Sequence, residues 1–213
     1  MINHLDNIDI SSQDVERQVK SYSLVFPRDR DETVEWGMKL PMFIYSFYKY
    51  IAKHNSIPSQ GDFYNQYISD NKEWFKKHGD SEKRLKGIKA RVFRAYPSIV
   101  RDIHFALVVK ERGNFNKVIY NYDIDIQKGI DLVIYNTGYS FNNNRYTSKR
   151  YAVNLFTNTD RAFQGRNKKG SRHGKILGVE YIDMPISFKG SKKCGCFYLY
   201  HNRELDILRR YIG

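Results

Sequence analysis

Carboxylates beside an apolar segment are the residues of this chain best suited to chemistry. Residues 130–135 form an apolar run interrupted only by Asp131, which follows Gly129. An apolar run of this length predicts a central strand. A carboxylate on a buried strand is costly unless something compensates it. A divalent cation such as Mg²⁺ does so, because it takes oxygen ligands and can activate water. The alternative is that Asp131 caps a turn or pairs with a neighbouring cation such as Lys128.

Other acids extend this hypothesis. Asp102 falls in a predicted helix that begins at Pro97, and Asp125 follows a predicted strand over 117–122. Both are further candidate metal ligands after Asp131. The sequence therefore predicts a metal site whose ligands come from a helix and from the strands that follow it.

The elements from residue 97 onward must position these acids. The hydrophobic period changes from helical to strand-like near residue 113 and alternates thereafter. The predicted order is helix, three strands, helix, two strands and a closing helix: 97–111, 117–122, 130–135, 150–157, 160–169, 175–182, 196–200 and 203–212. This order predicts an α+β or α/β fold, with a mixed sheet flanked by helices.

The first part of the chain is predicted to be helical. Residues 1–31 are polar and charged and predict a loosely docked arm with a short helix over 12–25. Residues 32–54 predict a helix interrupted near Pro41. Ser59 is predicted to cap a further helix, and residues 82–96 predict another. We therefore expect a helical region over 1–96 and a second domain over 97–213. The helical region fits either a DNA-contacting module or a plain bundle.

Positive charge is concentrated in the second domain. The chain carries a formal net charge of +13, of which residues 1–96 hold +3 and residues 97–213 hold +10. Residues 145–175 contain nine Lys or Arg and one acid. Binding of basic side chains to a phosphate backbone is favoured by counterion release, and the aromatic residues between them can stack on bases. A solvated surface or an acidic protein partner is the alternative. The candidate nucleic-acid contacts are Arg145, Arg150, Arg161, Arg166, Lys169 and Arg172.

Composition excludes several classes of protein. An aromatic content of 15% argues against a disordered chain, and two cysteines cannot support a disulfide scaffold. The longest apolar runs, such as 105–109, are far shorter than the roughly 20 residues that a helix needs to span a bilayer. The first residues show no secretory leader. We expect a cytoplasmic protein that does not bind a membrane. Its expected partner is DNA, with RNA and the protein subunits of a larger complex as further candidates.

The pattern over residues 97–185 resembles the restriction-endonuclease-like superfamily, the PD-(D/E)xK nucleases. The likeness lies in a helix, a three-stranded meander, a helix and a strand, with Gly-Ile-Asp-Leu-Val-Ile at 129–134. It implies that Asp131 is the strand aspartate and Asp102 the helix acid, and that both hold Mg²⁺ or Mn²⁺. It also implies cleavage of phosphodiester bonds by metal-activated water.

The third strand departs from the family pattern of acid-x-Lys. The matching residues are Asn154, Leu155 and Phe156. Asn154 still offers an oxygen ligand, but Phe156 cannot replace the lysine, so Lys149 or Lys168 would have to do so. The resemblance therefore implies a metal-dependent DNA endonuclease, or a nuclease subunit of a transposition or defence system. The alternative is a catalytically inactive, DNA-binding subunit of a larger nucleoprotein complex.

Overall fold

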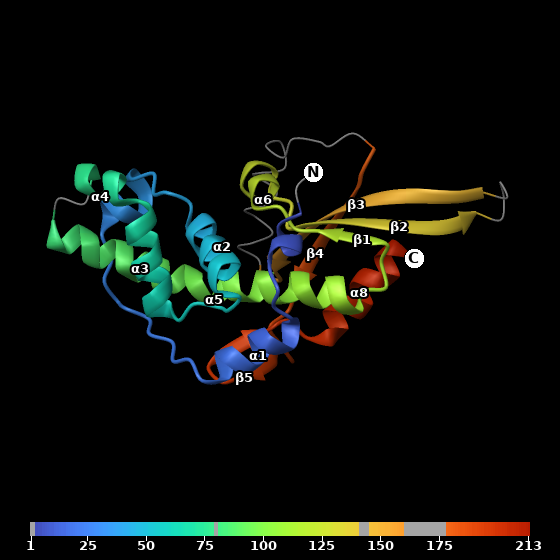
Figure 1. The fold of residues 1–213 in the computed structure, drawn as a ribbon, viewed down its shortest axis with the longest axis horizontal. Helices are drawn as coiled ribbons and strands as arrows, with labels where there is room; N and C mark the ends of the chain where they lie inside the picture. Colours follow the sequence, from blue (N-terminus) through green and yellow to red (C-terminus); the bar gives the residue numbers. More distant parts are fainter. Residues whose placement is uncertain (1–2, 79–80, 141–144, 160–177) are drawn as a thin grey trace. The chain divides into compact units, whose positions relative to one another are not determined.

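The computed structural model describes residues 3–78, 81–140, 145–159 and 178–213 (Figure 1). It divides into two compact units. A helical unit comprises residues 8–101 and 194–197, and a mixed unit comprises the described parts of 3–7, 102–193 and 198–213. The division thus falls within a helix, a few residues after the boundary expected at residue 96. None of the helices in these ranges is long and apolar enough to cross a membrane.

The helical unit is built around large aromatic side chains. Phe47 packs edge-on against Phe63, and Tyr96 lies against both rings. Ser59 caps the helix that follows it by accepting a hydrogen bond from the Asp62 amide at 3.1 Å, as predicted. The helices are α1 (Ser12–Lys20), α2 (Phe43–His54), α3 (Gln60–Asp70), α4 (Lys72–His78) and the first part of α5 (Glu82–Arg112), with a single π-helical turn, η2 (Thr33–Gly37).

Pro97 does not begin a new helix, contrary to our prediction. It lies inside the continuous helix α5. A proline in a helix lacks the N–H that would bond to the carbonyl four residues earlier. That carbonyl, of Phe93, accepts a hydrogen bond from Gln60 Nε2 at 3.0 Å instead. Gln60 is buried, so a tertiary contact supplies the donor that the helix itself lacks.

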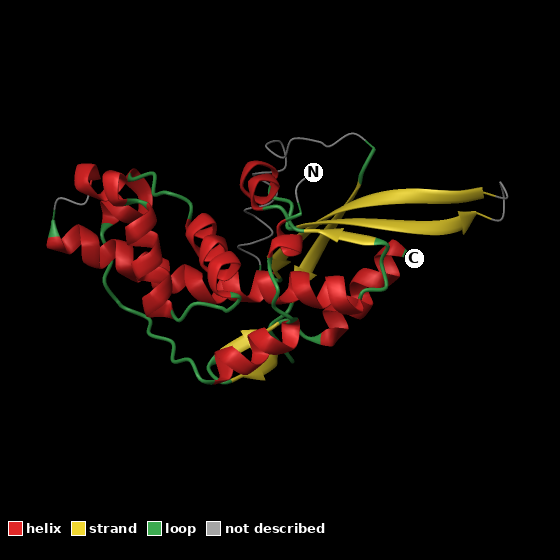
Figure 2. Cartoon of the chain, viewed as in Figure 1, coloured by secondary structure: helices red, strands yellow, loops and turns green. Residues whose placement is uncertain are grey.

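The mixed unit contains a four-stranded sheet in the order β1-β2-β3-β4 (Figure 2). Neighbouring strands are antiparallel for the first two pairs, and β3 and β4 are parallel. This confirms the expected mixed sheet with helices. The strands are β1 (Lys117–Ile119), β2 (Leu132–Ser140), β3 (Arg145–Thr157) and β4 (Glu180–Ile186), and the helices are η1 (His4–Asn7), the second part of α5, α6 (Tyr122–Lys128) and α8 (Asn202–Ile212). A separate ribbon pairs β5 (Lys192–Cys194) with β6 (Phe197–Leu199).

Both faces of the sheet are covered. On one face, Val133 and Ala152 form a core cluster against which Ile124 of α6 packs. On the other face, the hydroxyl of buried Tyr151 donates to the Ile212 carbonyl of α8 at 3.3 Å. Helix α6 was not predicted, because its seven residues are too few to show a helical period.

Three strand boundaries differ from the predicted ones: the end of β2, the start of β3 and the end of β4. The segment 136–144 was expected to be a polar loop, but β2 continues to Ser140 and β3 begins at Arg145. Polar residues can form these strands, because antiparallel pairing satisfies the backbone whatever the side chains. The strand expected over 175–182 is β4, which ends four residues later. The helix expected over 160–169 lies outside the described residues.

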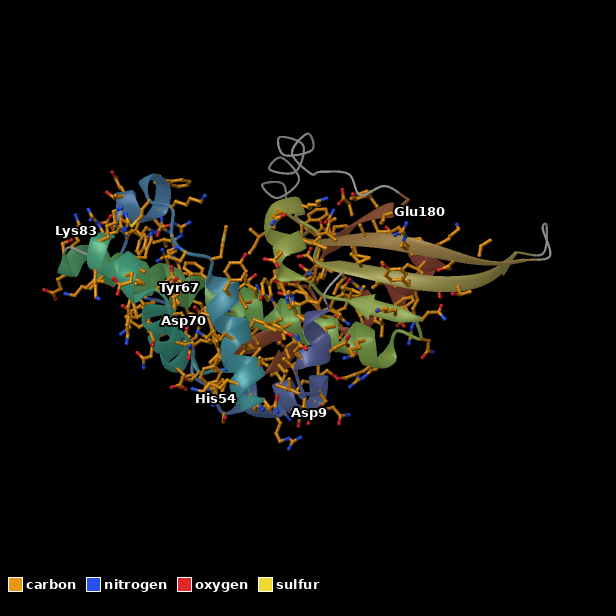
Figure 3. All side chains as sticks on the ribbon, turned by 45° about the horizontal axis from the view of Figure 1, so that its top comes forward. Asp9, His54, Tyr67, Asp70, Lys83 and Glu180 are labelled. Atoms are coloured by element: carbon orange, nitrogen blue, oxygen red, sulfur yellow. The ribbon has the colours of Figure 1, made fainter. Side chains whose placement is uncertain are left out.

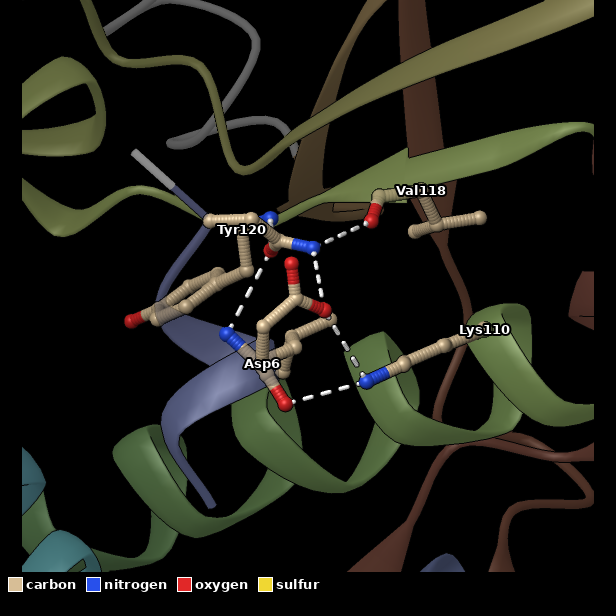
Figure 4. Close-up of polar contacts among 6 residues, drawn as sticks. Asp6, Lys110, Val118 and Tyr120 are labelled. Carbon is tan, nitrogen blue, oxygen red and sulfur yellow. Dashed lines mark hydrogen bonds and ion pairs between the residues drawn. The ribbon is translucent and has the colours of Figure 1, made fainter. Parts of the chain in front are cut away.

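Residues 3–7, the N-terminal segment, dock on the edge of β1, whereas a loosely attached arm was expected over residues 1–31 (Figure 4). The Asn3 side chain donates to the Val118 carbonyl at 3.1 Å and accepts from the Tyr120 amide at 3.1 Å. The His4 amide donates to the Tyr120 carbonyl at 2.9 Å. Lys110 Nζ donates to the Leu5 carbonyl at 3.0 Å. These contacts cap the exposed edge of the sheet, which would otherwise present unpaired backbone groups.

Candidate functional site

Three polar residues lie on β3, on β4 and directly before β2. The register of β2 and β3 begins with Leu132 opposite Val153, and Asp131, one residue before β2, bonds to the Val153 carbonyl and the Leu155 amide on either side of Asn154. The parallel register pairs Asn154 with Asp183. Because paired residues of neighbouring strands project from the same face, Asn154 and Asp183 lie side by side on one face of the sheet. Below we call Asp131, Asn154 and Asp183 the polar row.

Asn154 lies at the centre of the polar row and is buried, with 4% of its surface exposed. Its Nδ2 donates to Asp183 Oδ1 at 2.8 Å. Its Oδ1 is buried and accepts no hydrogen bond from any described residue. A buried carbonyl oxygen without a donor is unfavourable, and a cation would compensate it.

Asp131 is held against β3 by the backbone. Its amide donates to the Val153 carbonyl at 2.9 Å, and its Oδ2 accepts from the Leu155 amide. Gly129, which precedes it, adopts a left-handed conformation (φ 62°) that ends α6 and turns the chain into β2. One backbone bond therefore ties Asp131 to β3, and one side-chain bond holds its carboxylate at the residue after Asn154.

The polar row offers oxygen atoms from two carboxylates and one amide. Oxygen ligands of these types suit Mg²⁺ and Mn²⁺. The described residues hold no cluster of three or more His, Cys, Asp or Glu arranged as a metal site. A cation on the polar row would therefore depend on the Asn154 amide oxygen, which fits that role because it is buried without a donor.

Asp102, the predicted second ligand, lies on α5. Its Oδ1 accepts a hydrogen bond from the hydroxyl of Tyr200 at 3.1 Å. The structure thus gives this helix acid a phenol partner from the segment that follows β6.

Of the two residues considered as replacements for the missing lysine, only Lys149 lies in the part of the chain that the structure describes. Lys149 lies on β3 five residues before Asn154, about 16 Å along an extended strand. Its Nζ is 3.3 Å from Glu180, which Figure 3 labels, and this carboxylate raises the pKa of Lys149. Lys168 lies outside the described residues. Phe156, where the family pattern has lysine, is a half-buried β3 residue two positions after Asn154.

Most of the predicted nucleic-acid contacts cannot be located on the fold. Arg150 is exposed on β3, and its guanidinium lies against Gly178. Arg145 begins β3. Four of the predicted contacts, Arg161, Arg166, Lys169 and Arg172, lie outside the described residues.

Asp125 lies on α6, the helix that covers the face carrying Asp131 and Asn154. Its carboxyl is desolvated, and burial raises its pKa to about 6. An acid in this state is neutral in mildly acidic solution and ionised at neutral pH. Asp125, which the sequence suggested as a further ligand, is a partly buried carboxyl on α6.

Sequence reasoning missed Asp183. The predicted strand ended at residue 182, one position before it. An isolated acid in the otherwise apolar segment 181–186 is the signal that could have drawn attention to this residue. Its partner could not be identified, because the register between two strands depends on the whole sheet.

Comparisons with protein-family models, with curated proteins and with solved structures found no match for this chain.

Proposed function

We propose that this chain is a metal-dependent DNA endonuclease, or a nuclease subunit of a DNA-processing system of the transposition or defence type. One observation carries the proposal. The Asp131 carboxylate bonds to the amide of Leu155, the residue after Asn154, and the buried amide oxygen of Asn154 has no donor among the described residues. Asp131 and Asn154 are the two positions at which the restriction-endonuclease-like pattern has its metal ligands.

The order of elements supports the same proposal. A long helix leads into three strands paired antiparallel in chain order, with α6 between the first two, and a further strand then adds in parallel beside the third. This order supports the resemblance in its first helix, its three antiparallel strands and its last strand, whereas the helix expected between the last two strands lies outside the described residues. It also brings the second and third strands together where Asp131 and Asn154 lie.

The residues have separate roles in the proposed reaction. Asp131 and Asn154 would hold Mg²⁺ or Mn²⁺, with Asp102 as the helix acid implied by the resemblance. When bound, the metal would activate water and neutralise charge on the cleaved phosphate. Lys168 or Lys149 would orient the water, and the basic residues over 145–175 would hold the DNA backbone.

The test is cleavage of a supercoiled plasmid by the purified chain with Mg²⁺ or Mn²⁺. We expect nicking or linear product from the unmodified protein and none from Asp131→Ala. Asp206→Ala is the matched control, because Asp206 lies on α8 and forms an ion pair with Arg209. Cleavage that persists in Asp131→Ala at the same rate would falsify the proposed site.

Phe156 favours a second function, that of an inactive, DNA-binding subunit. An apolar ring two residues after Asn154 cannot stabilise the developing charge as a lysine does. Under this alternative the chain binds DNA in a salt-dependent way but does not cleave it. Phe156→Lys then provides the discriminating experiment: metal-dependent cleavage gained by this variant would show that only the lysine was missing.

A further inference from the structure

Asp183 of β4 is the hydrogen-bond partner of the Asn154 side-chain amide. Asn154 is 29 residues away in the sequence, yet its Nδ2 lies 2.8 Å from Asp183 Oδ1. We infer that Asp183 is a positioning residue of the divalent-cation site, and that it fixes Asn154 with its oxygen available to the metal. This inference rests on the proposed function and adds a positioning residue to it.

Asp183 can fix the orientation of Asn154 because the two ends of a side-chain amide differ in hydrogen bonding. An ionised carboxylate only accepts hydrogen bonds, whereas an amide has a donor end and an acceptor end. Rotating the Asn154 amide by 180° would bring its oxygen against Asp183, with no proton between the two acceptors. Asp183 therefore selects the one rotamer that leaves Oδ1 on the side away from β4.

Burial makes this selection consequential. Asn154 has 4% of its surface exposed, so water cannot readily satisfy whichever end faces away from Asp183. Because that end is the oxygen, the site attracts a cation. The reversed amide would present an NH₂ group, which repels a cation. Groups that orient a metal ligand in this way influence metal affinity strongly, by about 10- to 100-fold.

Binding of Mn²⁺ alone tests the inference without DNA. The electron paramagnetic resonance signal of free Mn²⁺, titrated with the full chain, gives the dissociation constant. We expect Asp183→Ala and Asp183→Asn to weaken binding by about 10- to 100-fold. Glu180→Gln is the matched control, since Glu180 lies on the same strand and pairs with Lys149 instead.

An exchange of the two side chains separates positioning from general structural support. In the double variant Asn154→Asp with Asp183→Asn, the amide at 183 donates to the carboxylate at 154. The hydrogen bond and the total charge are kept, and an oxygen is still presented to the metal. We expect this exchange to restore Mn²⁺ binding that Asp183→Asn loses. A purely structural role predicts altered thermal stability with unchanged affinity in all of these variants.

The outcomes distinguish the inference from the proposed function. Tight Mn²⁺ binding by both Asp183 variants, with binding lost in Asp131→Ala, overturns the role of Asp183 and leaves the metal site standing. Failure of the double exchange to recover affinity in a folded protein also overturns it. Absence of Mn²⁺ binding by the unmodified chain overturns the metal site itself.

Discussion

The side-chain amide of Gln60 donates a hydrogen bond to the carbonyl oxygen of Phe93, the oxygen that Pro97 leaves without a helical donor. The two residues are 33 positions apart in the sequence. Gln60 also bonds to Val25 in both directions, accepting from its amide at 2.8 Å and donating to its carbonyl at 3.1 Å. One buried amide therefore ties three segments of the helical unit together.

Removal of this amide should destabilise the helical unit. Gln60→Ala leaves the Phe93 carbonyl without a donor, which costs about 1–3 kcal/mol for a buried group. In a Pro97→Ala background the residue-97 amide can bond to Phe93, so the same substitution should cost less. Urea unfolding of the four proteins measures this coupling. Gln127→Ala, at an exposed position on α6, should change the free energy of unfolding by less than about 0.5 kcal/mol.

The docked N-terminal segment should protect the edge of β1. Asn3→Ala removes the acceptor of the Tyr120 amide and the donor to Val118, so the Tyr120 amide should exchange its hydrogen faster. We expect a loss of about 1–2 kcal/mol in stability. Hydrogen exchange followed by NMR gives both values. The exposed neighbour Asn7 provides the control, and equal exchange rates in Asn3→Ala and Asn7→Ala would contradict the prediction.

His4 should make the same segment sensitive to acid. Its ring stacks on Tyr122, with 3.7 Å between ring centroids, and its Nδ1 accepts from the Tyr122 amide at 3.3 Å. Burial lowers the pKa of His4 below its usual value of 6.5, although nearby Asp123 opposes the shift. The stabilisation is therefore present above pH 6.5 and is lost as the pH falls through the lowered pKa.

The variant His4→Phe isolates this effect, because it keeps a stacked ring but does not titrate. The difference in unfolding free energy between the two proteins, measured in urea from pH 5 to 8, should favour wild type less at pH 5 than at pH 8. A difference that does not change with pH would rule out His4 as the acid-sensitive group.

Asp125 should give folding stability the opposite pH dependence, with stability falling as the pH rises. Its pKa is raised from 3.8 to about 6 by burial, so the folded chain holds this proton more tightly than the unfolded chain. Stability from this group is complete below about pH 4 and is lost as the pH rises through 6, a change of about 2–3 kcal/mol. Asp125→Asn should therefore be more stable than wild type at pH 7 and similar at pH 3.5. Unfolding curves at the two pH values test this, and equal stability at pH 7 would refute it.

Several local elements of this protein follow from residue type and spacing alone. Ser59 caps α3, and the apolar stripe of the closing helix forms α8 over Asn202–Ile212. The strands around residues 132–135 and 150–157 and the prominence of Asp131 were also evident from sequence. These features depend on contacts within a few residues, which spacing and residue type express directly.

Only the tertiary structure decided the relationships between distant segments. Pro97 stands inside a helix because Gln60 supplies the missing donor, and Asn3 docks on β1 through contacts more than 100 positions away. The partnership of Asn154 with Asp183 depends on the register of two parallel strands, which packing of the whole sheet fixes. The alternation of residues along one strand predicts which of its side chains share a face. The residue opposite each of them on the neighbouring strand depends on the register, which forms when the strands pair.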